Sequence, residues 1–287
     1  MLAPEDLTAL LRTSYGWAEV AVTTHDTGMN SRTWWVDHDA GRAVAKWVPT
    51  DDVTSLRAGV AAADLAAASG VATGRHLGDI VEYDGGTVVV LELVPGTELT
   101  GDEPGDAEAI GATLARVHRA TAGRTVEGAL DVLAWVDPSV PELGMDEDVR
   151  AAVATAVRRL AAVADRLTVG VGHGDPSPEA FLRDGQQIGL IDWASCVNGP
   201  LLFDLASAAM YLDGLEEAAP MLAAYARAGG PVPADEVTAH AGAMLDFRWA
   251  VQAQYFAGRL ATADLTGLDS DAGNLKGFAD ARSSLLG

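Results

Sequence analysis

Residues 173–193 read HGDPSPEAFLRDGQQIGLIDW and contain two aspartates, Asp175 and Asp192, that are 17 positions apart (192 − 175). Each aspartate lies at one end of a predicted β-hairpin that turns at Asp184-Gly185. A hairpin folds back on itself, so the two carboxylates can approach each other. One can then accept a proton while the other holds a divalent cation. Aspartate is also a common turn or cap residue, but the apolar strands that precede both residues favour the chemical interpretation.

This stretch resembles the catalytic segment of the aminoglycoside phosphotransferase and choline kinase family, whose members are relatives of protein kinases. The shared pattern is His-Gly-Asp, then a strand ending in Ile-Asp-Trp, then Asp-Leu-Ala at 204–206. The resemblance implies that Asp175 is the catalytic base and that Asp192 is a magnesium ligand. It also implies that Asp204 supports the catalytic loop, and His173 is expected to orient that loop through hydrogen bonds.

A lysine lies on a strand of apolar residues in the N-terminal part of the chain. The sequence AVAKW at 43–47 resembles the kinase strand whose lysine contacts the α- and β-phosphates, which implies that role for Lys46. An unpaired buried ammonium group is costly, so Lys46 is expected to have an acidic partner, and Asp64 on the following helix is the candidate. Asn30 and Ser31 lie where the phosphate-covering loop of the family is expected and are assigned to the nucleotide site.

Glu92, Leu93 and Val94 precede Pro95-Gly96, the expected connection between two lobes. In the family, backbone groups of this connection bind the adenine edge of the nucleotide. The resemblance therefore assigns these three residues to nucleotide binding and implies ATP as the cofactor. Side chains contribute little to this kind of contact, so the sequence leaves the choice between ATP and GTP open.

One position departs from the family pattern. Five residues after Asp175 the family has an asparagine that is its second metal ligand, and this chain has Ala180. A methyl group cannot coordinate Mg²⁺, so Glu179 or Ser177 replaces the ligand, one cation suffices, or the protein is a degraded kinase. Glu179 is the assigned second ligand because a carboxylate suits a hard cation such as Mg²⁺.

The rest of the chain divides into a β-rich part and a helical part. Alternation predicts strands at 18–24, 33–36, 42–48, 80–83, 87–93, 169–171, 181–183 and 187–191. Helical spacing predicts helices at 4–13, 53–68, 106–121, 146–167 and 233–263. With the resemblance, this layout predicts an α+β, two-lobed, protein-kinase-like fold. The β-rich N-lobe is expected at 1–94 and the mainly helical C-lobe at 95–287.

The chain is acidic and contains one cysteine. Its 287 residues include 41 Asp and Glu against 19 Lys and Arg, a formal net charge of −22 at pH 7. This charge argues against nucleic acid and membrane as partners, because clusters of Lys and Arg supply the affinity for both. Cys196 alone cannot form an intrachain disulfide. The first residues carry acids where a signal peptide is basic, so a cytoplasmic location is expected.

The helices that follow the catalytic segment build the acceptor site in this family. The candidates for acceptor binding on these helices are Asp213, Asp246, Trp249 and Tyr255. Acidic and aromatic side chains suit a cationic acceptor such as an aminoglycoside or an amino alcohol. The expected function is ATP-dependent phosphotransfer to a hydroxyl of a small molecule. A macrolide, sugar, amino acid or peptide hydroxyl is an alternative acceptor, and an inactive nucleotide-binding scaffold is the alternative role.

Overall fold

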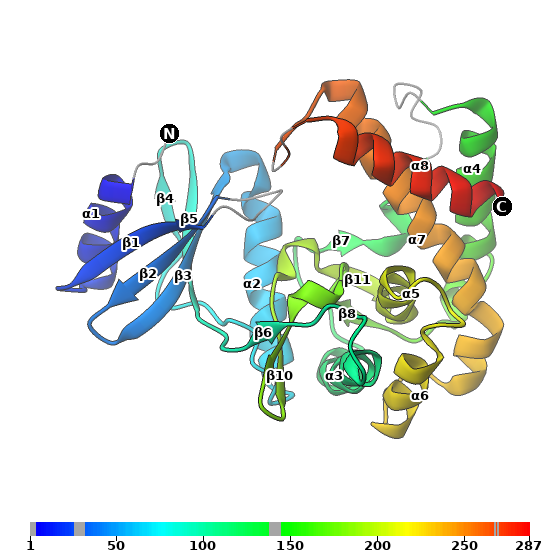
Figure 1. Ribbon diagram of the computed structural model, residues 1–287, viewed down its shortest axis with the longest axis horizontal. Helices are drawn as coiled ribbons and strands as arrows, with labels where there is room; N and C mark the ends of the chain where they lie inside the picture. Colours follow the sequence, from blue (N-terminus) through cyan, green and yellow to red (C-terminus); the bar gives the residue numbers. More distant parts are fainter. Residues whose placement is uncertain (1–3, 26–31, 138–144, 267, 269) are drawn as a thin grey trace.

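The computed structural model of the protein describes residues 4–25, 32–137, 145–266, 268 and 270–287. An antiparallel sheet lies toward the N-terminal end of the molecule, and a larger, mainly helical part follows it (Figure 1). This arrangement confirms the predicted α+β class. Among the described residues, no helix is both long enough and apolar enough to cross a membrane.

The N-terminal sheet has five strands in the order β1-β2-β3-β5-β4. They are β1 (Val20–His25), β2 (Arg32–His38), β3 (Gly41–Pro49), β4 (Val81–Tyr83) and β5 (Gly86–Glu92), with helix α1 (Pro4–Tyr15) packed on one face. Successive side chains of a strand point to opposite faces. Ala43 and Ala45 of β3 pack with Leu11 of α1. Val44 and Lys46 therefore point to the other face, where they line a cavity next to the helical part.

Helix α2 (Val53–Ala67) lies between the sheet and the helical part (Figure 1). Its residues Ala58, Ala62 and Ala66 are buried in the same hydrophobic cluster as the C-terminal helices. At Gly59 the absence of a side chain allows a close approach, because a Cβ atom there would lie 2.7 Å from the carbonyl oxygen of Trp193. Helix α2 thus packs on the C-terminal core although it follows the sheet in sequence. The lobe boundary at residue 94 stays a prediction.

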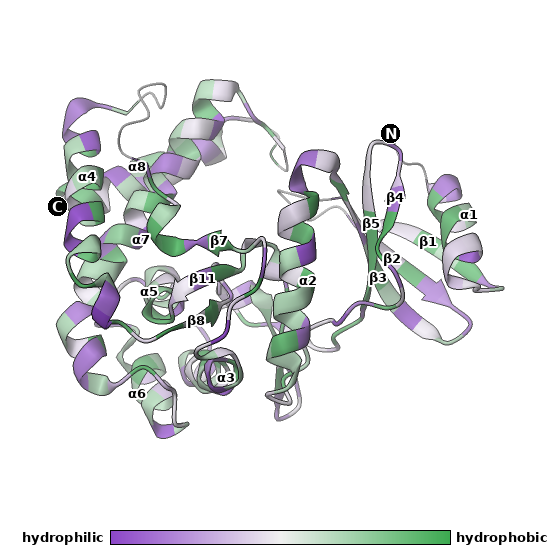
Figure 2. Cartoon of the chain, turned by 180° about the vertical axis from the view of Figure 1, so that it is seen from behind, coloured by the Kyte–Doolittle hydropathy of each residue, from purple (hydrophilic) through white to green (hydrophobic). Residues whose placement is uncertain are grey.

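Helices account for most of the C-terminal part. They are α3 (Asp106–Thr121), α4 (Glu147–Ala161), α5 (Leu202–Tyr211), α6 (Ala219–Arg227), α7 (Ala234–Thr262) and α8 (Ala272–Leu286). Helix α4 buries Val149, Val153, Ala156 and Leu160, a spacing of three and four residues that places them on one face. Figure 2 shows the result as alternating green and purple segments along α4 at the outer edge of the molecule. Helix α7 is 29 residues long and packs against α4, α5 and α8.

Two small sheets hold the segments that the sequence singled out. One has the order β10-β9-β6 and the other β7-β11-β8. Their strands are β6 (Thr97–Glu98), β7 (Leu130–Asp131), β8 (Val169–Gly172), β9 (Phe181–Asp184), β10 (Gln187–Leu190) and β11 (Val197–Pro200). Strand β8 ends directly before His173, and the β9–β10 hairpin ends two residues before Asp192. The structure therefore places the segments that carry Asp175 and Asp192, as predicted, at strand ends of the C-terminal part.

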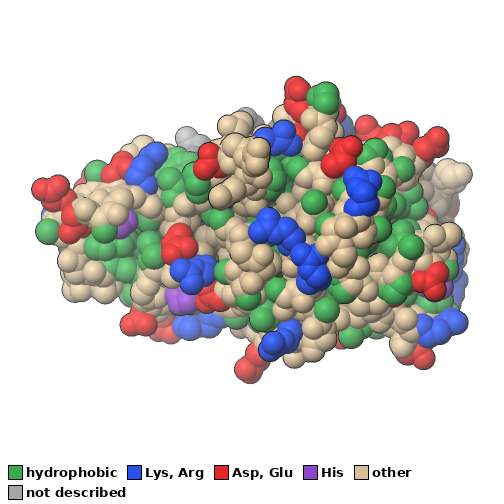
Figure 3. All heavy atoms as spheres, turned by 90° about the horizontal axis from the view of Figure 1, so that it is seen from below, with side chains coloured by type: hydrophobic (Ala, Val, Ile, Leu, Met, Phe, Trp, Pro, Cys, Tyr) green, Lys and Arg blue, Asp and Glu red, His purple; other side chains and the backbone are tan. Residues whose placement is uncertain are grey.

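The acidic residues are not gathered into one patch on the face seen in Figure 3. Red acidic side chains are scattered over that face, and several blue basic side chains lie near its middle. On this face the acidic side chains are therefore dispersed, as expected of solvated side chains.

Candidate active site

A cavity of about 120 Å³ lies between the N-terminal sheet and the C-terminal part. Its apolar walls come from β2, β3, α2, the connection after β5, strand β9 and the segment after β10. The lining residues are Trp35, Val44, Lys46, Leu56, Gly59, Val60, Ala63, Thr73, Gly74, Leu91, Glu92, Leu93, Val94, Leu182, Ile191, Asp192, Trp193 and Ala194. Such a cavity, apolar with a few converging polar groups, is the usual form of a small-ligand site.

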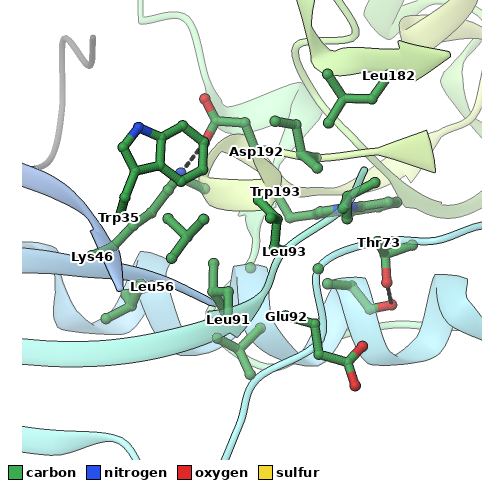
Figure 4. A pocket seen from close by; sticks show the side chains of 18 residues that line it. Trp35, Lys46, Leu56, Thr73, Leu91, Glu92, Leu93, Leu182, Asp192 and Trp193 are labelled. Carbon is green, nitrogen blue, oxygen red and sulfur yellow. Dashed lines mark hydrogen bonds and ion pairs between the residues drawn. The ribbon is translucent and has the colours of Figure 1, made fainter. Parts of the chain in front are cut away.

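Lys46 and Asp192 meet at the polar end of this cavity (Figure 4). The Lys46 ammonium group donates a hydrogen bond to Oδ1 of Asp192 at 2.9 Å. The positive charge of Lys46 is the main reason why the pKa of Asp192 lies below its ordinary value, while burial acts in the opposite direction. Asp192 has a φ of 66°, in the left-handed region that aspartate tolerates better than most residues. This backbone turn occurs immediately after the hairpin and directs the carboxylate into the cavity.

The expected pair of Lys46 with Asp64 is not formed, which corrects the prediction from the sequence. Asp64 pairs with His76 instead, at 3.1 Å between Oδ2 and Nδ1. The residues of α2 that face the cavity are Leu56, Gly59, Val60 and Ala63. Asp64 follows this stripe by one residue, a rotation of about 100° around the helix axis, and so lies beside the cavity wall. Asp192 is thereby the acidic partner that Lys46 has in this structure.

The connection after β5 places Leu93 and Val94 on the cavity wall. The backbone N–H of Glu92 donates to the carbonyl oxygen of Arg75 at 2.8 Å, and its carboxylate pairs with the Arg75 guanidinium at 3.2 Å. Figure 4 shows the Glu92 side chain pointing away from the cavity. Leu93 and Val94 are thus the residues of this connection that face the cavity without being engaged by Arg75. Asn30 and Ser31 lie outside the described residues.

Trp35 is a cavity residue that the sequence did not single out. Tryptophans are most often core residues, and its neighbour Trp34 is indeed buried in the core beneath α1. Alternation along β2 points Trp35 to the opposite face, so its indole ring lies next to Lys46 and Asp192 (Figure 4). The strand pattern could have indicated that the two rings diverge, but not which of them faces a cavity.

The loop after β8 is held by the buried carboxylate of Asp204, at the start of α5. Its two oxygens accept the backbone N–H groups of His173 at 2.7 Å and Gly174 at 2.8 Å. The ring of His173 lies between two backbone groups. Its Nε2 donates to the carbonyl oxygen of Ile191 at 2.8 Å, and its Nδ1 accepts from the N–H of Asp175. His173 thus ties the loop that carries Asp175 to the strand that leads to Asp192.

The Asp204 carboxylate is itself held by a buried pair of rings. Nε2 of His118 lies 3.0 Å from Oδ2 of Asp204, and Nδ1 of His118 lies 3.0 Å from the hydroxyl of Tyr225. Burial by itself raises the pKa of Asp204, but the hydrogen bonds and the neighbouring histidines outweigh it and leave this pKa below its ordinary value. The charged form of Asp204 is therefore the form that the folded protein stabilises.

Asp175 receives two donors from the C-terminal helices. The hydroxyl of Tyr211, at the end of α5, donates to Oδ1 of Asp175 at 2.7 Å. A guanidinium nitrogen of Arg248, in the middle of α7, donates to the same oxygen at 2.8 Å. The sequence places both residues on the helices expected to bind the acceptor but does not connect either with Asp175, because nothing local marks a tyrosine or an arginine that is 36 or 73 positions away from its partner.

The two candidates for metal binding have different surroundings. Asp192 lines the cavity, and its Oδ2 has no hydrogen-bond partner among the described residues. Glu179 is exposed in the turn before β9, and its charge acts on Tyr211. Ala180 is buried in the core, and its carbonyl oxygen accepts the N–H of Ile191. Within the described parts of the chain, no three His, Cys, Asp or Glu side chains lie close enough to hold a metal ion by themselves.

The four candidates for acceptor binding are not brought together around Asp175. Asp246 pairs with Arg159 of α4, and Trp249 packs against the main core. The hydroxyl of Tyr255 accepts a hydrogen bond from Arg259, and Asp213 is an exposed residue with a φ of 63° after α5. The residues of these helices that contact Asp175 are Tyr211 and Arg248 instead.

Solved structures with the same architecture include kinases of small molecules. An aminoglycoside 2'-phosphotransferase-IIIa in complex with GDP is 16% identical, with 98% of this chain and 99% of that chain covered and a TM-score of 0.72. Choline kinase LicA from Streptococcus pneumoniae is 16% identical, with coverage of 98% and 98% and a TM-score of 0.70. Amicoumacin kinase hAmiN with AMP-PNP, Ca²⁺ and Ami is 16% identical, with coverage of 98% and 93% and a TM-score of 0.70. These similarities show a protein-kinase-like fold.

The sequence itself gives the narrower assignment. The profile of the phosphotransferase enzyme family (APH) matches residues 21–241, which is most of the chain. The protein therefore belongs to this family of phosphotransferases, as the motif in 173–193 indicated. No curated protein sequence matches the chain.

Proposed function

We propose that this protein transfers the γ-phosphate of ATP to a hydroxyl group of a small molecule. The observation that carries the proposal is the Lys46–Asp192 pair, at 2.9 Å, on the wall of an apolar cavity. Asp175 belongs to the loop that His173 joins to the segment before Asp192. The family of the chain and its kinase neighbours support this assignment. In this proposal residues 1–94 cover the nucleotide and residues 95–287 carry the reacting groups.

Each residue then has a task that its surroundings suit. The Lys46 ammonium group would bind the α- and β-phosphates, and the backbone of Leu93 and Val94 would bind the edge of the base. Asp175 would hold the acceptor hydroxyl by a hydrogen bond and take its proton. Phosphoryl transfer depends mostly on alignment and on compensation of charge, and these residues supply both.

The residues present fit a bound Mg²⁺ ion. Asp192 is a hard oxygen donor whose Oδ2 is not engaged by any described residue, and Glu179 is the second acidic candidate. Few protein ligands are needed, because Mg²⁺ in such sites is bound by one or two carboxylates together with the phosphates of the substrate. When bound, Mg²⁺ compensates the charge of the phosphate oxygens. Lys46 would keep Asp192 ionised and in place for it.

The acceptor we propose is an aminoglycoside-type antibiotic or a related amino alcohol. Solved structures that share the fold include kinases of aminoglycosides, choline and amicoumacin, and a macrolide 2'-phosphotransferase. A cationic acceptor is also favoured by the net charge of −22. The use of ATP is in keeping with a cytoplasmic location. Ala180, in place of the asparagine of the family, favours a second candidate function, an inactive scaffold that binds nucleotide.

A phosphate-transfer screen tests the proposal. Purified protein with ATP and Mg²⁺ is incubated with aminoglycosides, choline-like amino alcohols, macrolides, amino acids and peptide antibiotics, and phosphorylated products are detected by mass spectrometry. We expect one class to be phosphorylated. Asp175→Asn should lower the turnover by about 10²- to 10⁴-fold, the usual contribution of a general base, and should leave nucleotide affinity nearly unchanged. Nucleotide binding with neither transfer nor slow ATP hydrolysis would instead support the scaffold.

A further inference from the structure

We propose that Arg248 is a positioning residue for this phosphotransfer, which fixes Oδ1 of Asp175 and leaves Oδ2 for the acceptor hydroxyl. The inference rests on the proposed function, since it gives Asp175 the role of base. It adds a residue of helix α7 that lies 55 positions (248 − 193) after Trp193, the end of the catalytic segment.

Both donors to Asp175 use the same oxygen atom. The Arg248 guanidinium lies 2.8 Å from Oδ1, and the Tyr211 hydroxyl lies 2.7 Å from Oδ1. No hydrogen bond to Oδ2 exists within the part of the chain that the structure describes. The Asp175 side chain is 43% exposed whereas that of Arg248 is 3% exposed, so the carboxylate is open on one side only. One oxygen is thus engaged by the protein and the other is available to a ligand.

The Arg248 guanidinium is itself held in place by contacts with α5, so that it can fix the position of the Asp175 carboxylate. Its Nε donates to the hydroxyl of Ser207 on α5, and its guanidinium carbon lies 5.8 Å from the centre of the Tyr211 ring. An arginine that is removed from water needs its counterion, because an uncompensated buried charge is strongly destabilising. The ion pair therefore constrains the loop of Asp175 as much as it constrains Arg248.

Tyr211 contributes a donor that does not change with pH in the usual assay range. Burial and the neighbouring charge of Asp175 raise the pKa of Tyr211 well above its ordinary value. Its hydroxyl stays protonated and continues to donate to Oδ1. Two donors from α5 and α7 then define the orientation of the carboxylate plane.

The consequence for the reaction concerns Oδ2. In the transfer step the acceptor oxygen forms a bond to the γ-phosphorus, and the bond from that phosphorus to the β–γ bridging oxygen breaks. The acceptor proton passes to Oδ2 of Asp175, and ADP leaves with the bridging oxygen. If the carboxylate could rotate, the acceptor hydroxyl would lose its alignment with the phosphorus. A misplacement of about 1 Å can cost on the order of 100-fold in rate.

The test compares variants that change the charge and the shape of this contact. We expect Arg248→Met to lower kcat for phosphate transfer about 10- to 100-fold, with the nucleotide dissociation constant within about twofold of wild type. Arg248→Lys keeps the charge but lacks the planar guanidinium, and should recover part of the loss. Arg259→Met is the matched control, since Arg259 is also buried on α7 but bonds to Asn274. This control should alter stability without a comparable loss of kcat.

Two further measurements separate positioning from a purely structural role. Guanidinium ions added to Arg248→Ala should restore part of kcat, because they can enter the space of the missing side chain. The melting temperatures of Arg248→Met, Asp175→Asn and the double variant should be non-additive, which tests the contact without any activity assay.

The outcomes distinguish this inference from the proposed function. A folded Arg248→Met protein with the kcat of wild type, or additive melting shifts, overturns the role of Arg248 while the phosphotransfer stands. A wild-type protein that phosphorylates no acceptor contradicts the proposed function, and with it the role of Arg248 in transfer. Lower kcat in Arg248→Met, rescue by guanidinium and non-additive melting together support the inference.

Discussion

The ammonium group of Lys46 lies 2.9 Å from Oδ1 of Asp192, although the two residues are 146 positions apart in the chain. Lys46 belongs to the N-terminal sheet, and Asp192 follows a hairpin of the C-terminal part. Their contact therefore places a cation and an anion side by side in the cavity before any ligand arrives. A nucleotide with its metal would find both charges already in position, and preorganised charges of this kind cost little to align during reaction.

Replacement of this lysine should weaken nucleotide binding. A hydrogen bond to a charged group contributes about 1.5–3 kcal/mol, so Lys46→Met should raise the ATP dissociation constant about 10- to 150-fold. Isothermal titration calorimetry measures the change. Lys276→Met is the control, because Lys276 is an exposed residue of α8 that pairs with Asp280. Equal ATP affinity in the wild type and Lys46→Met would show that Lys46 does not contribute to nucleotide binding.

Removal of the indole ring of Trp35 should also weaken nucleotide binding. The ring is part of the apolar cavity wall, and the apolar contacts of one such side chain contribute about 1.5–3 kcal/mol, so Trp35→Ala should lose about 10- to 150-fold in ATP affinity while Trp35→Phe keeps most of it. Trp17→Phe is the control, since Trp17 stacks on His38 and is not part of the cavity wall. The intrinsic fluorescence of the wild type should change on titration with ATP. A change of equal size in Trp35→Phe would show that another tryptophan reports binding.

Magnesium dependence should reveal whether Glu179 is a second ligand. Glu179→Gln should raise, several-fold, the Mg²⁺ concentration that gives half of the maximal rate, because a neutral amide binds a hard cation less strongly than a carboxylate. Glu82→Gln serves as control, since Glu82 is exposed on β4 of the N-terminal sheet. An unchanged Mg²⁺ requirement in Glu179→Gln would leave Asp192 as the protein ligand of a single ion.

Acid should destabilise the protein in part through Asp204. The pKa of this carboxyl is lower in the folded protein than its ordinary value of 3.8. Its charge therefore stabilises the fold above that pH, and the contribution is lost as the pH falls through the lower folded-state pKa. Asp204→Asn should reduce the free energy of unfolding by about 3–5 kcal/mol near neutral pH. The difference between variant and wild type should shrink below about pH 4.

Thermal melts between about pH 7 and pH 3 measure this effect. The control is Asp280→Asn, which removes an exposed carboxylate that pairs with Lys276 on the surface. Its melting temperature should stay close to that of wild type throughout, because exposed ion pairs contribute little. A constant difference between Asp204→Asn and wild type at every pH would contradict the assigned titration of Asp204.

The elements with strong local signals were predictable from the sequence. Helix α3 has the bounds that its periodicity predicted, 106–121, and the predicted β9–β10 hairpin is present, although its two-residue turn is Gly185-Gln186, one residue later than expected. Strands β6 and β7, with two residues each, are too short to show alternation, and β11 contains Gly199 and Pro200, which are uncommon in strands, so none of the three was predicted. Their pairing depends on partners that are distant in sequence, such as β6 on β9.

Parts of the candidate site could not be predicted for a related reason. Neighbouring residues of α2 point in directions about 100° apart, so a difference of one position decides whether an acidic side chain faces Lys46. Sequence periodicity does not locate a helix more precisely than about one residue. Asp64 lies one residue beyond the cavity-facing residues of α2 and pairs with His76. Arg248 reaches Asp175 through the packing of α7 on α5, and tertiary contacts of this kind leave no trace in local spacing.

The close approach at Gly59 links helix α2 mechanically to the loop that carries Asp192. A Cβ atom at residue 59 would lie 2.7 Å from the Trp193 carbonyl oxygen, which is nearer than real Cβ atoms come to other atoms. Because backbone meets backbone there, α2 cannot shift toward this loop without pushing on the residue next to Asp192. Any side chain at position 59, even a single methyl group, would force the two segments apart. A substitution of Gly59 is therefore compatible with this fold only if the loop that carries Asp192 shifts as well.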